Sequence, residues 1–152
     1  MSREILFKAK YVDTGEWVEG SLVHYKAGKK HFIITDNDFQ WGMYGSYSYD
    51  GDFTEIDETT ICQYTGLTDK NGNKIWENDV LKIARTSDSI GEYYYPPLDY
   101  PANVVVKWDL CAWMWETIEK RKHYISFPDA WCHYEAEVIG NIFDNSELLK
   151  GE

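Results

Sequence analysis

Apolar and polar residues alternate along most of this chain, and such alternation is typical of half-buried β-strands. Short runs rich in Val, Ile, Thr and aromatic residues recur about every ten residues, bounded by Gly, Asn, Asp or Pro. Helical spacing of apolar residues is scarce by comparison. The pattern therefore predicts a mainly β protein whose short strands pair through tight turns.

The N-terminal part is predicted to be an antiparallel hairpin that extends into a small sheet. Residues 5–12 and 17–25 are the two strand-like runs, and Asp-Thr-Gly-Glu lies between them at 13–16. Gly15 can adopt the positive φ that such a turn requires. A third strand is expected over residues 31–35.

Further strands are expected along the rest of the chain. The Asn71-Gly72 pair favours a type I′ turn, and Asn145 or Ser146 can cap a short terminal helix. We place a boundary near residue 60, between an N-terminal β region (1–60) with an aromatic loop and a second β region (61–152); a single continuous domain is the alternative. The further strands are expected at residues 53–56, 60–64, 80–84, 104–109, 112–118, 124–127 and 135–143.

Two aromatic segments interrupt the strand pattern. Residues 36–52 mix Gly, Ser and Asp with five aromatic residues, and we expect a loop or irregular hairpin there. Residues 85–103 contain Tyr-Tyr-Tyr-Pro-Pro and are expected to form a long connection. Tyr, Ser and Gly together suit recognition surfaces, because rings give contact area at low entropic cost; the alternative is that the rings complete the core. The candidate binding residues are Trp41, Tyr44, Tyr47, Tyr49, Tyr94 and Tyr95.

The charge distribution argues against nucleic-acid binding. The net charge is −11, and residues 35–69 hold eight acidic residues and no basic one. Binding to nucleic acid relies on Lys and Arg that neutralise phosphates. The one local basic cluster, at residues 120–122, is too small to indicate such a surface. The hydrophobic content of 43% and aromatic content of 16% exclude a disordered chain.

The sequence indicates a soluble protein of the cytoplasm. Lys8 and Lys10 interrupt the only apolar run near the N-terminus, so no secretory signal is visible. No run approaches the roughly 18 apolar residues of a membrane span. The three cysteines are an odd number without a Cys-x-x-Cys pair, and we expect them to be reduced, with a packing role.

No metal or cofactor site is predicted. Cys132 and His133 are neighbours, so on a strand they would point to opposite faces and could not hold one ion together. Residues 69–73 resemble the opening of a calcium loop, but Lys74 and Val80 stand where Gly and Glu are needed. The remaining candidate ligands, for which no spacing supports a site, are Cys62, Cys111, His24 and His123.

Three separate segments carry a family resemblance. They are Arg-Glu-Ile-Leu-Phe-Lys-Ala at 3–9, Gln-Tyr-Thr-Gly-Leu-Thr-Asp-Lys-Asn-Gly-Asn-Lys-Ile-Trp-Glu-Asn-Asp-Val-Leu-Lys-Ile at 63–83 and Val-Ile-Gly-Asn-Ile-Phe-Asp-Asn-Ser-Glu-Leu-Leu at 138–149. In this order they resemble the YopX family of phage and prophage proteins. The resemblance implies a mainly β fold with a barrel-like C-terminal part and expression in a bacterial cytoplasm; it implies no activity and no catalytic residues. The family usually has Gly where this chain has Asn78, and Asn also tolerates the left-handed backbone.

Function is expected to lie in the outer surface. The favoured hypothesis is a non-catalytic module that binds a host or phage protein, or a second copy of itself, without a cofactor. The alternative is an acidic decoy that occupies a nucleic-acid-binding surface of a host protein, suggested by the basic-free stretch from His31 to Asp69. An enzyme is not expected, because the chain has no Gly-x-Ser-x-Gly, P-loop or Gly-x-Gly-x-x-Gly motif.

Overall fold

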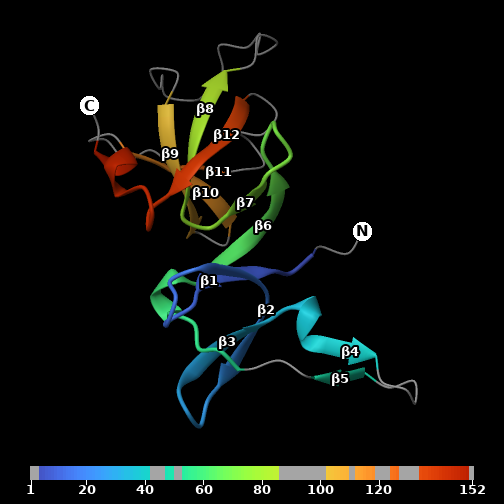
Figure 1. The fold of residues 1–152 in the computed structure, drawn as a ribbon. Coiled ribbons are helices and arrows are strands. Elements are labelled where there is room, and N and C mark those ends of the chain that lie inside the picture. Colours follow the sequence, from blue (N-terminus) through green and yellow to red (C-terminus); the bar gives the residue numbers. More distant parts are fainter. Residues whose placement is uncertain are drawn as a thin grey trace. The chain divides into compact units, whose positions relative to one another are not determined.

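The computed structural model describes residues 4–41, 47–49, 53–85, 102–109, 112–118, 124–126 and 134–150. The chain divides into two compact units, residues 1–64 and 65–152, and each is considered by itself (Figure 1). The structure confirms a mainly β, antiparallel protein. The division into domains at residue 60 stays a prediction, because compact units are not by that fact independently folding domains.

The strands of the first unit belong to a five-stranded sheet with the order β3-β2-β1-β6-β7, of which β7 (Lys74–Trp76) follows residue 64. Those of the first unit are β1 (Phe7–Lys10), β2 (Trp17–Tyr25), β3 (Lys30–Ile34) and the start of β6 (Cys62–Thr68). The predicted first hairpin is confirmed, since Gly15 has a φ of +71° and Lys10 pairs with Trp17 next to the turn. The core of this unit consists of Ala9, Val18, Ile33 and Ile56, with Phe7, Tyr11, Leu22 and Ile61 packed against it.

The segment predicted as a strand over residues 53–56 is a pair of single bridges. Ile56 pairs with Tyr11 and Glu55 pairs with Phe32, so the segment links the end of β1 to the middle of β3. Asp57 then caps a 3-10 turn, η2 (Glu58–Thr60), by accepting from the Thr59 amide at 2.9 Å. Because of this turn, β6 begins at Cys62 and not at residue 60 as predicted. The Cys62 thiol is buried, as expected.

A two-stranded ribbon lies outside both larger sheets. It follows the 3-10 turn η1 (Asp36–Asp38) and consists of β4 (Phe39–Trp41) and β5 (Tyr47–Tyr49). The irregular hairpin expected within residues 36–52 is therefore present. The expected long connection at 85–103 lies, except for its ends, outside the described residues.

The second unit contains a five-stranded sheet with the order β11-β10-β9-β8-β12. In the described residues this sheet is open, so the expected barrel does not close. Its core surrounds the fully buried Trp115, whose ring meets the Tyr134 ring edge-on at 5.9 Å. The strands of this unit are the end of β6, β7 (Lys74–Trp76), β8 (Asp79–Arg85), β9 (Ala102–Asp109), β10 (Ala112–Thr117), β11 (Tyr124–Ser126) and β12 (Tyr134–Asn141).

A turn covers the outer edge of β12, which explains why this edge is not used to close a barrel. The Lys70 amide donates to the Ala136 carbonyl at 3.0 Å, and the Val138 amide donates to the Asp69 carboxylate at 3.1 Å. The Lys70 ammonium also pairs with Glu137 at 2.7 Å. The turn occupies donors and acceptors that a closing strand would need.

The carboxylate of Asp69 organises this turn. It is buried and accepts hydrogen bonds from the Asn71 amide at 2.8 Å, the Asn73 amide at 2.9 Å and the Asn73 side chain at 3.1 Å, besides that from Val138. Burial alone raises the pKa of Asp69, but these hydrogen bonds outweigh it and hold the pKa below its usual range. The predicted type I′ turn is wrong, because Gly72 has a positive φ and Asn71 does not. With its side chain, Asp69 draws the Asn71 amide into a different turn.

The next turn confirms the expectation for Asn78. This residue has a φ of +66°, which is the left-handed conformation that Gly usually adopts. Its amide donates to Val106 at 2.8 Å, and its side chain accepts from the Lys107 ammonium at 2.6 Å. Asp79 is buried and accepts from the Trp76 amide at 2.8 Å, as expected for an Asp in a turn.

The predicted terminal helix is a single 3-10 turn, η3 (Ser146–Leu149). Asn145 occupies the cap position, but its side chain does not cap the turn. Instead the side chain accepts a hydrogen bond from the Asn141 amide at 3.2 Å and so stabilises the C-terminal end of β12. Because the Asn145 side chain is engaged with Asn141, the 3-10 turn lacks a side-chain cap and does not continue into an α-helix.

We expect Asp69→Asn to destabilise the fold in a pH-dependent manner, and Asp69→Ala to cost about 3 kcal/mol at neutral pH, because a buried acceptor of four hydrogen bonds is lost. The folded-state pKa lies below the unfolded value of about 3.9, so the ionised form contributes stability above that value and loses it as pH falls through the folded pKa. Urea unfolding should therefore show a difference between wild type and Asp69→Asn that narrows below about pH 4. A constant difference would contradict this role, and the exposed Glu135→Gln on β12 is the control.

We expect Asn78→Gly to leave the protein more stable than Asn78→Ala by about 1 kcal/mol. Both variants lose the contact with Lys107, so their difference reports the cost of the left-handed backbone alone. Chemical denaturation of the two variants measures it. Equal stability, or a more stable Ala variant, would show that the positive φ does not persist in solution.

Candidate functional site

The β4–β5 ribbon brings aromatic positions together. Its register places Phe39 opposite Tyr49 and Trp41 opposite Tyr47. Positions two apart on a strand lie on the same face, so all four aromatic positions share one face of the ribbon. The other face carries the polar positions Gln40 and Ser48.

The structure thus places three of the six candidate binding residues on the same two-stranded ribbon. Trp41, Tyr47 and Tyr49 lie on the ribbon. Tyr44, Tyr94 and Tyr95 lie outside the described residues. Whether the aromatic residues form a contact surface stays a prediction.

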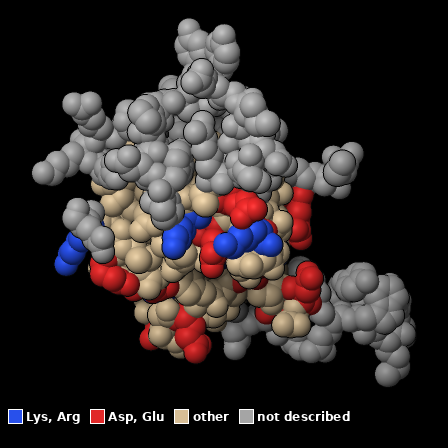
Figure 2. All heavy atoms as spheres, turned by 90° about the horizontal axis from the view of Figure 1, so that it is seen from above, with Lys and Arg blue, Asp and Glu red and all other residues tan. Residues whose placement is uncertain are grey.

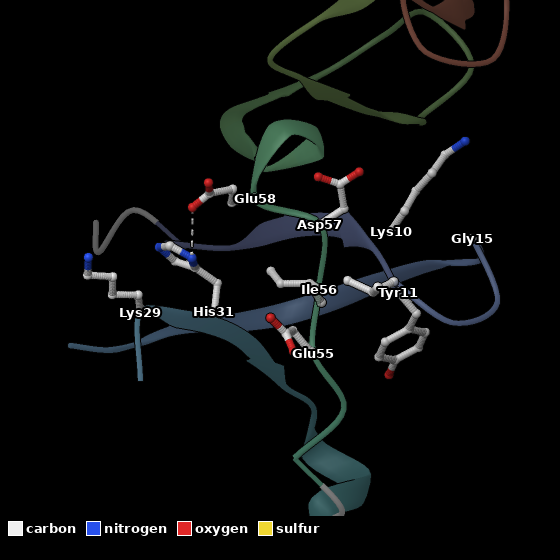
Figure 3. A pocket seen from close by; sticks show the side chains of 10 residues that line it. Lys10, Tyr11, Gly15, Lys29, His31, Glu55, Ile56, Asp57 and Glu58 are labelled. Atoms are coloured by element: carbon white, nitrogen blue, oxygen red, sulfur yellow. Dashed lines mark ion pairs between the residues drawn. The ribbon is translucent and has the colours of Figure 1, made fainter. Parts of the chain in front are cut away.

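A hollow of about 480 Å³ opens in the first unit, beside the segment that links β1 and β3 (Figure 3). The His31 and Glu58 side chains point toward one another, while the Lys10 side chain extends away from the other labelled residues (Figure 3). Sequence reasoning missed this hollow, because the bridging of residues 55 and 56 to two different strands creates it. The residues that line it are Lys10, Tyr11, Val12, Gly15, Lys29, His31, Glu55, Ile56, Asp57 and Glu58.

The carboxylates around the hollow already have partners in the fold. Glu55 pairs with the Lys30 ammonium at 2.5 Å, and Glu58 lies 3.5 Å from the His31 imidazole. Asp57 accepts from the Thr59 hydroxyl and amide, and these bonds lower its pKa from the usual value. The three acids therefore maintain local structure, and the arrangement gives no pair of unengaged carboxylates for acid–base chemistry.

Two histidines also meet in this unit. His24 of β2 lies directly opposite His31 of β3, and their ring centroids are 4.3 Å apart. The sequence contained a signal for this pair, because the two residues are equally distant from the middle of the turn at residues 26–29. The prediction of the second hairpin did not include its register, so the pair was missed.

Among the residues described, no group of three or more His, Cys, Asp or Glu side chains is arranged to hold a metal ion. Cys111, Cys132, His123 and His133 lie outside the described part of the chain. Over the residues that the structure describes, no helix is long and apolar enough to cross a membrane.

The acidic segment 35–69 is largely engaged within the first unit and the Asp69 turn. Asp38, for example, accepts from the Thr35 amide at 2.6 Å. Figure 2 shows one face of the molecule, on which acidic and basic side chains are interspersed among other residues. Five of the six acidic residues described in this segment contact a hydrogen-bond donor or a basic side chain: Asp38, Glu55, Asp57, Glu58 and Asp69.

Comparison with known proteins agrees with this fold. Residues 6–150 match the profile of the family described as YopX protein. A search of curated proteins finds no match. The crystal structure of protein EF1440 from Enterococcus faecalis is similar with a TM-score of 0.50 and 22% identity, covering 98% of this chain and 100% of that chain, a likeness that concerns the fold alone. Because the family profile spans nearly the whole sequence, this chain belongs to the YopX protein family.

Proposed function

We propose that this protein is a non-catalytic module that binds another protein through the aromatic face of the β4–β5 ribbon. The observation that carries the proposal is the register that sets Phe39 opposite Tyr49 and Trp41 opposite Tyr47. Aromatic residues gathered on one face are the usual centres of binding energy in protein interfaces.

The ribbon's isolation supports this assignment. It belongs to neither five-stranded sheet, and a two-stranded ribbon by itself is at best marginally stable in water. Cross-strand aromatic pairs add only about 0.2–1 kcal/mol each. A partner that covers the aromatic face would bury apolar area and stabilise the ribbon at the same time.

The chemistry of the partner follows from the residues around the ribbon. The segment from 36 to 52 carries four acidic residues and no basic one. We therefore infer a partner protein with an apolar groove bordered by Lys or Arg, since complementary charge at the rim favours encounter and orientation. We further propose that a phage or prophage gene encodes this protein and that it acts in a bacterial cytoplasm. The sequence resemblance supports this part of the proposal.

The acidic-decoy alternative receives less support. A decoy needs many carboxylates that face outward and are not engaged within its own fold. Most of the described acids in residues 35–69 serve as caps, turn acceptors or ion-pair partners, Asp57, Asp69 and Glu55 among them. Fewer charges therefore remain for a partner than the sequence count suggests.

Replacing two rings of the ribbon tests the proposal. In Trp41→Thr/Tyr47→Thr the rings are lost while strand propensity is kept. Wild-type protein immobilised in bacterial lysate should capture a defined partner, and the double variant should bind this purified partner at least tenfold more weakly in calorimetry. Gln40→Ala/Ser48→Ala changes the other face and should bind normally; a partner bound equally by both double variants would refute the aromatic face. Light scattering distinguishes a second copy of this chain as the partner.

The salt dependence of the same interaction separates the two hypotheses. Binding centred on the aromatic face should change little between about 0.1 M and about 0.5 M salt, because buried apolar contacts are not screened. A decoy held by surface carboxylates should weaken steeply over this range. Titrations of the purified partner at several salt concentrations measure the difference, and a steep loss would favour the decoy.

A further inference from the structure

The β2–β3 hairpin presents two imidazoles at neighbouring positions. His24 and His31 are direct partners in the antiparallel register, so they lie on the same face of the sheet. Their ring centroids are 4.3 Å apart, with 52° between the ring planes. Imidazole is a ligand that Zn²⁺, Ni²⁺ and Cu²⁺ prefer.

A carboxylate orients one of these rings. The Glu58 carboxylate lies 3.5 Å from Nδ1 of His31, and the dashed line in Figure 3 marks this contact. A carboxylate next to Nδ1 favours the tautomer with the proton on that nitrogen, which leaves the Nε2 lone pair available. Histidines that bind metals are commonly held in this way by an outer carboxylate.

The spacing of the rings is close to that of a bidentate site. Two imidazoles bound to one ion at about 2.1 Å, at angles between about 90° and 109°, have ring centroids roughly 4.6–5.3 Å apart. The observed 4.3 Å is slightly below this range, so binding one ion requires side-chain rotations that move the two rings a little apart. His31 is 17% exposed in its side chain, which leaves it accessible to an ion from solvent.

The surrounding charge favours a cation over an anion. Glu55, Asp57 and Glu58 line the hollow next to His31. Lys29 lines it too, whereas the Lys10 ammonium lies 5.3 Å from the centre of the Trp17 ring. Glu55 is paired with the Lys30 ammonium at 2.5 Å, so Asp57 and Glu58 are the carboxylates that outweigh Lys29, and an added divalent ion is electrostatically compatible with this side of the hairpin.

We propose that His24 and His31 form a binding site for a late first-row divalent metal ion of the Zn²⁺, Ni²⁺ and Cu²⁺ class, with Glu58 as a positioning residue. The two imidazoles are the protein ligands and water completes the coordination. An ion held there joins β2 to β3 next to the turn at residues 26–29. Because it binds the folded hairpin and not the unfolded chain, it stabilises the first unit. The site is separate from the aromatic ribbon and does not depend on the proposed protein partner.

Calorimetric titration of the untagged, EDTA-treated full chain with Zn²⁺ or Ni²⁺ tests the site. The wild type should bind one ion per chain, and either His24→Asn or His31→Asn should remove this binding at millimolar metal. Glu58→Gln should weaken binding by about tenfold while the metal-free melting temperature stays the same. Cu²⁺ added to the wild type should give an electron paramagnetic resonance signal with two nitrogen ligands, and neither His variant should give this signal.

The chain provides its own matched control in the remaining histidines, His123 and His133. His123→Asn and His133→Asn should bind metal as the wild type does. Loss of binding in these two variants, or retention of binding in His24→Asn and His31→Asn, would overturn the proposal. So would the absence of any binding by a wild-type chain whose circular-dichroism spectrum shows it to be folded.

Discussion

The second unit depends on the buried carboxylate of Asp69. It accepts hydrogen bonds from two backbone amides and one side-chain amide within its own turn. A fourth hydrogen bond comes from the amide of Val138, 69 residues further along the chain. One side chain therefore fixes both a local turn and a long-range contact. A buried acceptor of this kind is costly to leave unsatisfied, so turn and strand edge are stable only together. The covered edge of β12 and the open sheet are consequences of that coupling.

Carboxylates have a structural part throughout the described residues. Asp38 and Asp57 organise 3-10 turns, Asp79 holds the turn before β8, and Glu55 joins the linking segment to β3 through Lys30. In an antiparallel protein with many short connections, amides at the ends of strands need acceptors, and Asp supplies them at short range. The strongly negative sequence thus reflects how the turns are built as well as the chemistry of the surface.

Both functional proposals come from strand register in the first unit. Register decides which side chains stand opposite one another, and a shift by one residue would move each of them to the other face. In the ribbon it joins Phe39 to Tyr49 and Trp41 to Tyr47; in the β2–β3 hairpin it joins His24 to His31. The first set suits a protein partner because rings bury area. The second suits a metal ion because imidazoles carry lone pairs.

The sequence by itself determined the strand-rich fold, the first hairpin around Gly15 and the left-handed turn at Asn78, because alternation of side chains and tolerance of positive φ are local properties. It also identified the aromatic segment that contains Trp41 and Tyr47. Only the tertiary structure decided the turn type at Asp69, the covered edge of β12, the 3-10 end at Ser146–Leu149 and the meeting of His31 with His24 and Glu58. The covered edge and the histidine contacts depend on partners distant in sequence or on strand register. The two turns depend on which side chain captures a nearby amide, and the composition of a single short segment encodes none of these outcomes.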